Sequence, residues 1–497
     1  MKRHIFILIG LIALVFPTFA QITIDFPFTR MVFQRDLENR GKILITGSTI
    51  PKIDSVTVQF VPIAPETGQL QPEERCTNFR NENKQLFFSI IDAPSGWYNL
   101  IIRTYRNNQL IDVNSLEKIG IGDVFLIAGQ SNAQGNGFRN PPPSVDPYER
   151  VGTILDYSME LTQLSTFNYQ RLLAHFNLYP TGSSAWCYGL LGDLLVQRNN
   201  VPIMFLNAAM GSTSSTDWAL SVENKAQHTA NRADFPYHLL AKTLQFYGNI
   251  TGFRAILWHQ GEYDTLFPPI DSYFTNVSKV IQETRKLVNF PLPWVISEAS
   301  YFLEKTSPAV IADQRRLVHE IHQVYAGPAT DGYLNARSDG IHFSNEPGYN
   351  GLSLLAHSWE KALSPSFFEN AKPLLPTFTL PTVLYKNKTI KLPSTFAIAP
   401  YKTIFDSFQF IKSQNGNHYV SPKVVCPEII SITNTGEHPS DKTNKLYAQT
   451  KIEIGIPIQR KKFSVFAEEF ILLSPGFTTE SNSLFEAHLK GCYEGWE

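Results

Sequence analysis

Four short polar segments of this chain each follow an apolar run, and each holds groups suited to acyl-transfer chemistry. The first, Gly129–Gly135, follows the apolar run Val124–Ala128 and contains Ser131. A serine flanked by small residues is open to a substrate carbonyl, and a helix starting after it favours negative charge nearby. Ser131 is therefore a candidate nucleophile, although a glycine turn with an N-capping serine has the same pattern.

The second segment supplies the base that such a serine needs. A hydroxyl is a weak nucleophile until its proton is removed, and histidine is the usual base near neutral pH. A carboxylate must hold the imidazole ring. Asp339 and His342 can provide both groups from one loop near the last predicted strand. An ordinary polar loop can have the same spacing, so Asp339 and His342 indicate catalysis only if they lie beside Ser131.

The other two segments could stabilise the oxyanion that forms when a carbonyl is attacked. In Trp258–Glu262, Gln260 could donate a side-chain N–H, and Glu262 could orient a neighbouring group or act as an acid. In Asn207–Thr213, Gly211 would allow a backbone N–H to approach the substrate closely, although a plain turn glycine is the alternative.

Strands and helices alternate in the part of the chain that carries these segments. Continuous apolar runs predict parallel strands buried on both faces, at Val124–Ala128, Ile203–Leu206, Ala255–Trp258 and Trp294–Ile296. Helical periodicity appears between and after them, in segments that contain Leu190 to Leu195, Tyr273 to Ile281, Leu317 to Val324, and Leu352 to Trp359. The alternation predicts a doubly wound α/β layer, in which ligands bind at the carboxyl ends of the strands. All four polar segments lie at such ends.

The regions on either side are β-rich. Residues 21–118 contain short strand patterns separated by turn residues, typical of a β-sandwich, at 42–47, 55–61, 86–91 and 96–103. A Pro-rich stretch from Pro365 to Pro381 predicts a linker. Residues 382–497 again have strand patterns, such as 451–454 and 470–473, and a weak echo of Tyr447-Ala448 in Phe466-Ala467 and Phe485-Glu486-Ala487 fits stacked β-units.

The ends of the chain and its charge limit the classes of function. Lys2 and Arg3, an apolar run from Ile5 to Phe16, and small residues before Gln21 form the pattern of a secretory signal peptide, cleaved near Ala20. The apolar run is too short to span a membrane. A net charge of −1 gives no footprint for nucleic acid. We therefore expect a secreted, periplasmic or cell-surface protein with no membrane span and no nucleic-acid partner.

The cysteines do not have the spacing of a metal site. Cys76, Cys187, Cys426 and Cys492 are widely separated and include no C-x-x-C, so zinc binding is not expected. Cys426 and Cys492 could pair in an exported protein, and free buried thiols are equally plausible.

Taken together, these segments resemble the sialic-acid-specific acetylesterase family, a carbohydrate-esterase branch of the SGNH (GDSL-like) hydrolases. The resemblance covers about residues 119–362. It is carried by the motifs Gly122–Val124 with Gly129–Ala133, Trp258–Glu262, Gly327–Asp331, and Arg337–Ser344. The tail around Ile471–Phe477 and Ser483–Cys492 resembles a non-catalytic β-stack module of Bacteroidetes secreted proteins.

The resemblance implies a flavodoxin-like three-layer fold without a metal or other cofactor. Carried over to matching positions, it makes Ser131 the nucleophile, His342 the base and Asp339 the residue that orients it. It places the oxyanion hole at the backbone N–H groups of Ser131 and Gly211 and the side chain of Gln260, with Glu262 in support. Met210 stands before Gly211 where the family commonly has a second glycine.

The expected organisation is a signal peptide (1–20), an Ig-like β-sandwich (21–118), an SGNH-type esterase domain (119–366), a linker (367–381) and a β-rich module (382–497). The expected function is a serine esterase that removes acetyl groups from sialic acid or from plant or bacterial polysaccharide. Two alternatives stay open: a non-catalytic carbohydrate-binding surface protein, and an SGNH lipase or thioesterase with a preference for longer acyl chains. The sequence leaves the particular glycan and the oligomeric state open.

Overall fold

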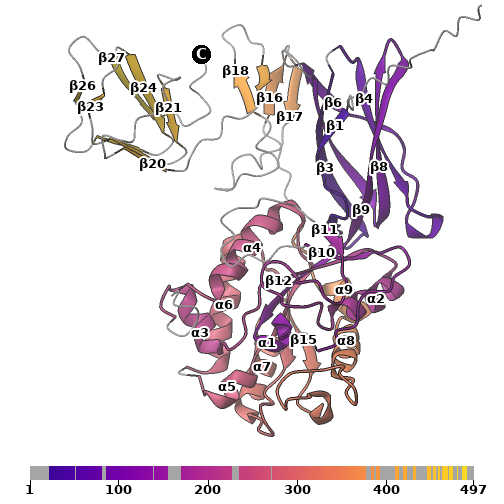
Figure 1. Ribbon diagram of the computed structural model, residues 1–497, viewed down its shortest axis with the longest axis vertical. Coiled ribbons are helices and arrows are strands. Elements are labelled where there is room, and N and C mark those ends of the chain that lie inside the picture. The colour runs from indigo at the N-terminus through magenta and orange to yellow at the C-terminus, as the bar shows by residue number, and fades with distance from the viewer. Residues whose placement is uncertain are drawn as a thin grey trace, which may run out of the picture.

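The computed structural model describes residues 22–50, 52–80, 85–137, 139–154, 169–226, 234–269 and 271–376, together with the backbone of short strands between 382 and 489 (Figure 1). The predicted signal peptide and the cysteines Cys426 and Cys492 lie outside the described residues. No helix in the described ranges has the length and apolar character needed to cross a bilayer.

The N-terminal region forms two antiparallel sheets that share one hydrophobic core. One sheet has the order β1-β3-β7-β6, and in the other β8 lies between β4 and the first half of β9, with β5 outside β4. The predicted strand patterns lie in β3, β4, β7 and β8. In β4 buried and partly exposed residues alternate, so Val56, Val58 and Phe60 point into the core. The strand bounds are β1 Ile22–Phe26, β2 Val32–Gln34, β3 Arg40–Thr49, β4 Ser55–Pro62, β5 Glu74–Arg75, β6 Thr77–Arg80, β7 Gln85–Pro94, β8 Gly96–Arg106 and β9 Gln109–Gly129.

Strand β9 continues without a break from the N-terminal region into the central domain. Its first part pairs antiparallel with β8, and its second part pairs in parallel with β12 and β13. At the junction, a Cβ on Gly122 would lie 1.9 Å from the carbonyl oxygen of Pro202, so only glycine fits there. The boundary predicted between residues 118 and 119 thus lies within one strand that both regions share.

The central sheet has the order β11-β10-β12-β9-β13-β14-β15, and all of its strands except β11 are parallel. The strands β12-β9-β13-β14-β15 follow the flavodoxin-like order, with β9 at the point where the strand order reverses. Their bounds are β10 Val151–Ile154, β11 Tyr169–Arg171, β12 Ile203–Asn207, β13 Ala255–His259, β14 Trp294–Glu298 and β15 Val324–Ala329.

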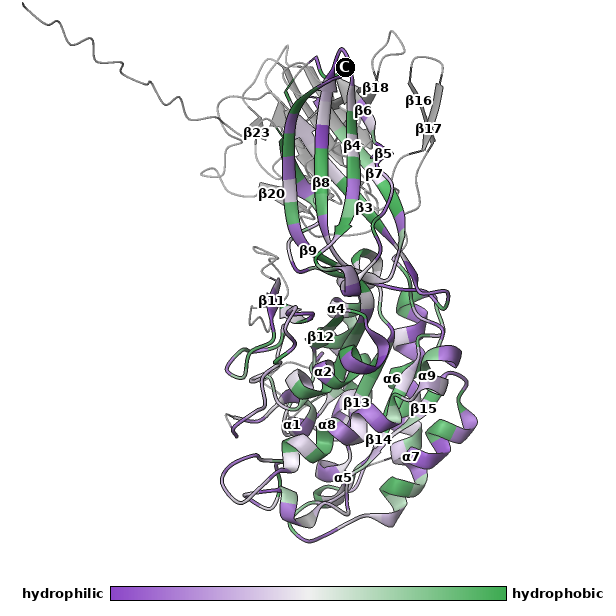
Figure 2. Ribbon diagram, turned by 90° about the vertical axis from the view of Figure 1, so that its right-hand side faces the viewer, coloured by the Kyte–Doolittle hydropathy of each residue, from purple (hydrophilic) through white to green (hydrophobic). Residues whose placement is uncertain are grey.

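Helices cover both faces of this sheet, with α3, α4, α6 and α7 on one side and α2, α8 and α9 on the other (Figure 1). Along β9, Val124, Leu126 and Ala128 join the core on the first side, while Phe125 and Ile127 join the second. The central strands are consequently hydrophobic over much of their length and end in polar residues (Figure 2). The helix bounds are α1 Ser131–Gln134, α2 Tyr188–Asn199, α3 Ser215–Val222, α4 Tyr237–Ile250, α5 Glu262–Leu266, α6 Tyr273–Val288, α7 Pro308–Glu320, α8 Gly351–Ala362, α9 Pro365–Asn370, with 3₁₀ turns at Pro65–Thr67 and Leu334–Ala336.

The structure differs from the sequence predictions at two element boundaries. Helix α7 ends at Glu320, because Ile321 is extended and Val324 already pairs with Trp294 as the start of β15. The first part of the predicted linker is also packed on the central domain, because α9 buries Phe367 in the second core and Leu374 exchanges backbone hydrogen bonds with Phe253, while residues 377–381 lie outside the described ranges. The chain therefore packs on the central domain up to about residue 376.

The C-terminal strands pair mostly in parallel, as stacked units do. They form the sets β20-β22-β25, β21-β24-β27 and β23-β26, besides two antiparallel pairs, β16-β17 and β18-β19. Tyr447 pairs with Phe466, in the register of the sequence echo, whereas Phe485 pairs with Phe463. The bounds are β16 Thr382–Tyr385, β17 Lys388–Lys391, β18 Gln409–Lys412, β19 His418–Ser421, β20 Ile429–Ile432, β21 Lys445–Ala448, β22 Lys451–Ile454, β23 Pro457–Ile458, β24 Lys462–Ala467, β25 Phe470–Leu473, β26 Thr478–Thr479 and β27 Leu484–Leu489.

Candidate active site

Ser131 is the first residue of α1, directly after the carboxyl end of β9. Gly129 makes this turn possible: its φ is +124°, and a Cβ there would lie 2.0 Å from the carbonyl oxygen of His259 at the end of β13. As the first residue of a helix, Ser131 has a backbone N–H with no acceptor inside that helix. Ser131 therefore places a hydroxyl and a backbone N–H at the edge of the sheet.

His342 and Asp339 lie beside this serine. His342 Nε2 is 3.0 Å from Ser131 Oγ, and His342 Nδ1 is 2.8 Å from Asp339 Oδ2. Asp339 Oδ1 accepts the backbone N–H groups of Ile341 and His342 at 2.9 and 2.7 Å. These local bonds explain the three-residue spacing, because the carboxylate folds its own loop while it holds the ring. The structure thus brings the predicted nucleophile, base and orienting carboxylate together.

The Asp339 carboxylate is held in its charged form. Partial burial would raise its pKa, but hydrogen bonds from the His342 backbone, the His342 ring and the Ile341 backbone lower it to about 2. Arg139 also donates to Asp339 Oδ2, at 2.7 Å, a contact that no sequence pattern predicted. A carboxylate that is charged at neutral pH can stabilise an imidazolium at His342.

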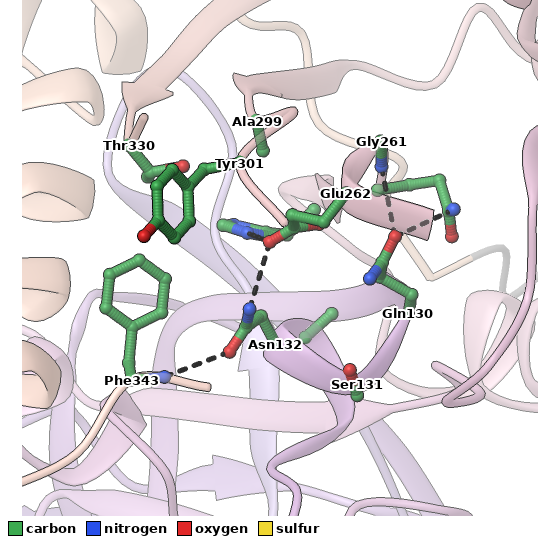
Figure 3. A network of polar contacts seen from close by, with 12 residues as sticks. Gln130, Ser131, Asn132, Gly261, Glu262, Ala299, Tyr301, Thr330 and Phe343 are labelled. Atoms are coloured by element: carbon green, nitrogen blue, oxygen red, sulfur yellow. Dashed lines mark hydrogen bonds and ion pairs between the residues drawn. The ribbon is translucent and has the colours of Figure 1, made fainter. Parts of the chain in front are cut away.

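Asn132 connects Glu262 to the loop that carries His342 (Figure 3). Asn132 Nδ2 donates to Glu262 Oε1 at 3.0 Å and to the carbonyl of Ile341 at 3.1 Å, while Asn132 Oδ1 accepts the N–H of Phe343 at 3.3 Å. Both neighbours of His342 are therefore anchored to the residue after Ser131. Sequence reasoning missed Asn132, although it lies in the same motif as Ser131.

Glu262 is fully buried and also accepts from His259 Nε2, at 2.8 Å. Burial would raise its pKa, but the His259 imidazole and the hydrogen bonds from His259 and Asn132 lower it to about 2. Glu262 is thus a charged acceptor for both His259 and Asn132.

Gln260 does not take the oxyanion-binding position that the resemblance implied. It is fully buried, and its Nε2 donates to Gln130 Oε1 at 2.9 Å, to the Thr213 carbonyl at 2.6 Å and to Asp264 Oδ2 at 2.9 Å. Among the described residues, these acceptors account for both hydrogens of the amide. The side chain thus joins the segments that follow β9, β12 and β13, and its N–H groups are taken up by protein acceptors.

Gly211 lies next to Ser131, as predicted. An ideal Cβ on Gly211 would be 3.4 Å from Ser131 Cβ and 3.1 Å from Gln134 Oε1. Its backbone N–H donates to that same Gln134 oxygen at 2.7 Å. Two of the three predicted oxyanion donors, the backbone N–H groups of Ser131 and Gly211, therefore belong to residues that are adjacent in space. The Gly211 N–H is already bonded to the Gln134 side chain.

The remaining reactive groups of the described residues do not form a second site. Cys76 and Cys187 are buried free thiols, and burial raises the pKa of Cys76 to about 12, so neither is a thiolate near neutral pH. Within the described part of the chain, no group of three His, Cys, Asp or Glu residues is arranged to hold a metal ion. The arrangement that can do chemistry is a hydroxyl, an imidazole and a carboxylate in sequence, with backbone amides beside the hydroxyl.

Comparison with known proteins relates the central domain by sequence to one family of esterases. Residues 121–359 match the sequence model of the family described as carbohydrate esterase, sialic acid-specific acetylesterase. No curated protein matches the chain in sequence. A solved carbohydrate acetylesterase from Xanthomonas citri is similar at 15% identity with a TM-score of 0.40, over 68% of this chain and 73% of that one. A protein from Arabidopsis thaliana is similar at 18% identity with a TM-score of 0.33, over 50% of this chain and 98% of that one. An esterase from a Pseudoalteromonas species is similar at 12% identity with a TM-score of 0.29, over 48% of this chain and 96% of that one.

Proposed function

We infer that the central part of this chain, residues 121–359, belongs to the carbohydrate esterase family of sialic acid-specific acetylesterases, because its sequence matches the model of that family. On that premise, we propose that the protein hydrolyses O-acetyl esters on carbohydrate, with Ser131 as nucleophile, His342 as general base and Asp339 as its orienting carboxylate. The observation that carries this proposal is the 3.0 Å separation of His342 Nε2 from Ser131 Oγ, in a ring whose other nitrogen faces Asp339.

The first half of the reaction forms an acetyl-enzyme. His342 Nε2 takes the hydroxyl proton as Ser131 Oγ attacks the acetyl carbonyl carbon, and the carbonyl electrons move onto oxygen. Backbone N–H groups of Ser131 and Gly211 donate to that oxygen, and one such donor contributes about 3 kcal/mol of barrier lowering. His342 then gives the proton to the sugar oxygen as the ester C–O bond breaks.

The second half releases acetate. Water loses a proton to His342 as its oxygen attacks the acetyl carbon, and the collapse of the second tetrahedral intermediate returns the proton to Ser131 Oγ. Asp339 stays ionised throughout and stabilises the imidazolium. The cycle needs no cofactor, in line with what the family resemblance implies.

The test is Ser131→Ala measured with p-nitrophenyl acetate. We expect the rate of hydrolysis to fall by about 10⁴-fold or more, as for other triad nucleophiles. Ser212→Ala is the matched control, because it removes an exposed hydroxyl from the residue after Gly211 and should leave the rate within about twofold. Activity of Ser131→Ala close to that of the unmodified protein would remove Ser131 from the reaction.

The acceptor and the acyl chain length need separate measurements. Acetate release from a panel of acetylated sialic acids, xylans and pectins would identify the carbohydrate. Nitrophenyl esters from acetate to laurate would distinguish an acetylesterase from a lipase or thioesterase. A protein that binds these glycans but releases no acetate would instead be the carbohydrate-binding alternative.

The flanking regions and the location belong to the same proposal. We infer that residues 1–20 direct export, that the N-terminal region is an Ig-like β-sandwich and that residues 382–497 form a non-catalytic β-module. The paired strands on both sides of the central domain support this organisation. N-terminal sequencing of the exported protein should begin near Gln21.

A further inference from the structure

Gln134 occupies the same side of α1 as Ser131. The two residues are three positions apart in the helix, and such residues are neighbours on a helix surface. Gly211 lies against both, since its ideal Cβ would be 3.1 Å from Gln134 Oε1 and 3.4 Å from Ser131 Cβ. Gln134 Oε1 and the Ser131 side chain therefore both lie against Gly211.

The orientation of the Gln134 amide is fixed by its two partners. Its Oε1 accepts the Gly211 N–H at 2.7 Å, and its Nε2 donates to the Thr181 carbonyl at 2.9 Å. A flipped amide would set a donor against the Gly211 N–H and an acceptor against the Thr181 carbonyl, so only the observed orientation satisfies both groups.

The acceptor at Gly211 is an amide carbonyl, the same kind of group as the ester carbonyl of a substrate. The predicted third donor, Gln260, is fully committed to Gln130, Thr213 and Asp264. The Gly211 N–H is therefore one of the two donors left to bind the oxyanion. In the protein without substrate, Gln134 Oε1 accepts this N–H.

We propose that Gln134 closes the oxyanion site of the resting enzyme and that the acyl oxygen of a substrate binds by displacing the Gln134 amide from Gly211. The proposal rests on the proposed esterase function. Because the Gln134 side chain is only partly buried, its amide can bond to water when it leaves the Gly211 N–H and the Thr181 carbonyl. Substrate binding and the formation of a two-donor oxyanion hole are then one event.

A structure of the Ser131 adduct with a p-nitrophenyl methylphosphonate tests the displacement directly, because the phosphonyl oxygen marks the oxyanion position. We expect this oxygen to accept the Gly211 N–H and the Gln134 side chain to have left it. An adduct in which Gln134 Oε1 still accepts the Gly211 N–H would overturn this proposal and leave the esterase function intact. A protein that forms no adduct at all would overturn both.

Labelling rates of variants give a second, independent test. Gln134→Ala and Gln134→Met remove the internal acceptor, and we expect them to react with the phosphonate about threefold to tenfold faster than the unmodified protein, the factor for one released hydrogen bond. Gln134→Glu should react at least tenfold more slowly, since a carboxylate binds the N–H more strongly and repels the oxyanion. Thermal melts confirm folding of each variant. Slower labelling of both Ala and Met variants would make Gln134 a support of the Gly211 loop and overturn the proposal.

Discussion

Two histidine–carboxylate pairs lie close to each other in this molecule, and only one of them faces a hydroxyl. His342 and Asp339 are separated by 2.8 Å and by three positions in the chain, and the same is true of His259 and Glu262. The first pair is partly exposed beside Ser131, while the second is almost completely buried. Equal spacing and equal distance therefore do not distinguish the pair that we propose as catalytic from the pair that supports it.

The difference lies in what the second ring nitrogen faces. His342 uses Nδ1 for its carboxylate and points Nε2 at Ser131, whereas His259 uses Nε2 for Glu262 and leaves Nδ1 buried without a partner among the described residues. The buried pair still acts on the site, because Glu262 holds Asn132 and Asn132 holds the backbone around His342.

The largest expected difference between the pairs is in catalysis. His342→Gln should lower kcat/KM for p-nitrophenyl acetate by about 10⁴-fold, because a glutamine amide cannot accept the serine proton. His259→Gln keeps a donor for Glu262, and its kcat/KM should stay within about 10²-fold of the unmodified protein. Steady-state kinetics on both purified variants measures the contrast. An equal loss of kcat/KM in folded His342→Gln and His259→Gln would contradict the assignment of different roles to the two pairs.

The second expected difference is in stability and its pH dependence. Folding lowers the pKa of Glu262 to about 2, so this carboxylate stabilises the fold above its unfolded pKa near 4, and the contribution is lost as pH falls toward 2. Glu262→Gln should therefore reduce the free energy of unfolding by roughly 1–3 kcal/mol at pH 7 and by progressively less below pH 4. Urea unfolding at pH 7, 4 and 3 measures this.

Asp339→Asn is the matched variant of the exposed pair. It should change the unfolding free energy less than Glu262→Gln, because Asp339 is about one-third exposed, but it should lower kcat by roughly 10²- to 10⁴-fold. A greater loss of stability in Asp339→Asn than in Glu262→Gln would contradict the assignment of the buried pair to support.

The smallest expected effect concerns Arg139, which shares Asp339 Oδ2 with the His342 ring. Arg139→Gln should lower kcat/KM by about threefold to tenfold, because the carboxylate loses one charged donor that fixes its position. Arg139→Lys should recover part of the loss. Arg315→Gln, which breaks the exposed ion pair with Glu298, is the control and should change kcat/KM by less than about twofold. Similar kcat/KM values for Arg139→Gln and Arg315→Gln would remove Arg139 from the positioning network.

Local patterns in the sequence predicted the parts of the fold and site that depend on local contacts. Period-two alternation located β4, and continuous apolar runs located β12, β13 and β14. The meeting of Ser131 with His342 followed from topology, because both follow strands of one parallel sheet and so come to the same edge. The family match then supported a reading that each motif alone left open.

The sequence could not predict features decided by contacts between distant segments. The direction of the Gln260 amide depends on Gln130 and Thr213 from two other strand ends, and no local spacing encodes that competition. The end of α7 depends on the pairing of Val324 with Trp294 in the sheet, which overrides the helical period through Ile321.

The continuity of β9 means that the start of the family match, at residue 121, is not a place where the chain can be cut. A fragment starting there would remove Gln34, whose side chain accepts the Val124 N–H, and Arg35, which shares the buried Asp123 carboxylate with Arg254. The strand is about 70 Å long at roughly 3.3 Å per residue, and the nucleophile turn sits at its far end. The N-terminal region therefore cannot be removed or exchanged as an independent unit without rebuilding the strand that ends beside Ser131.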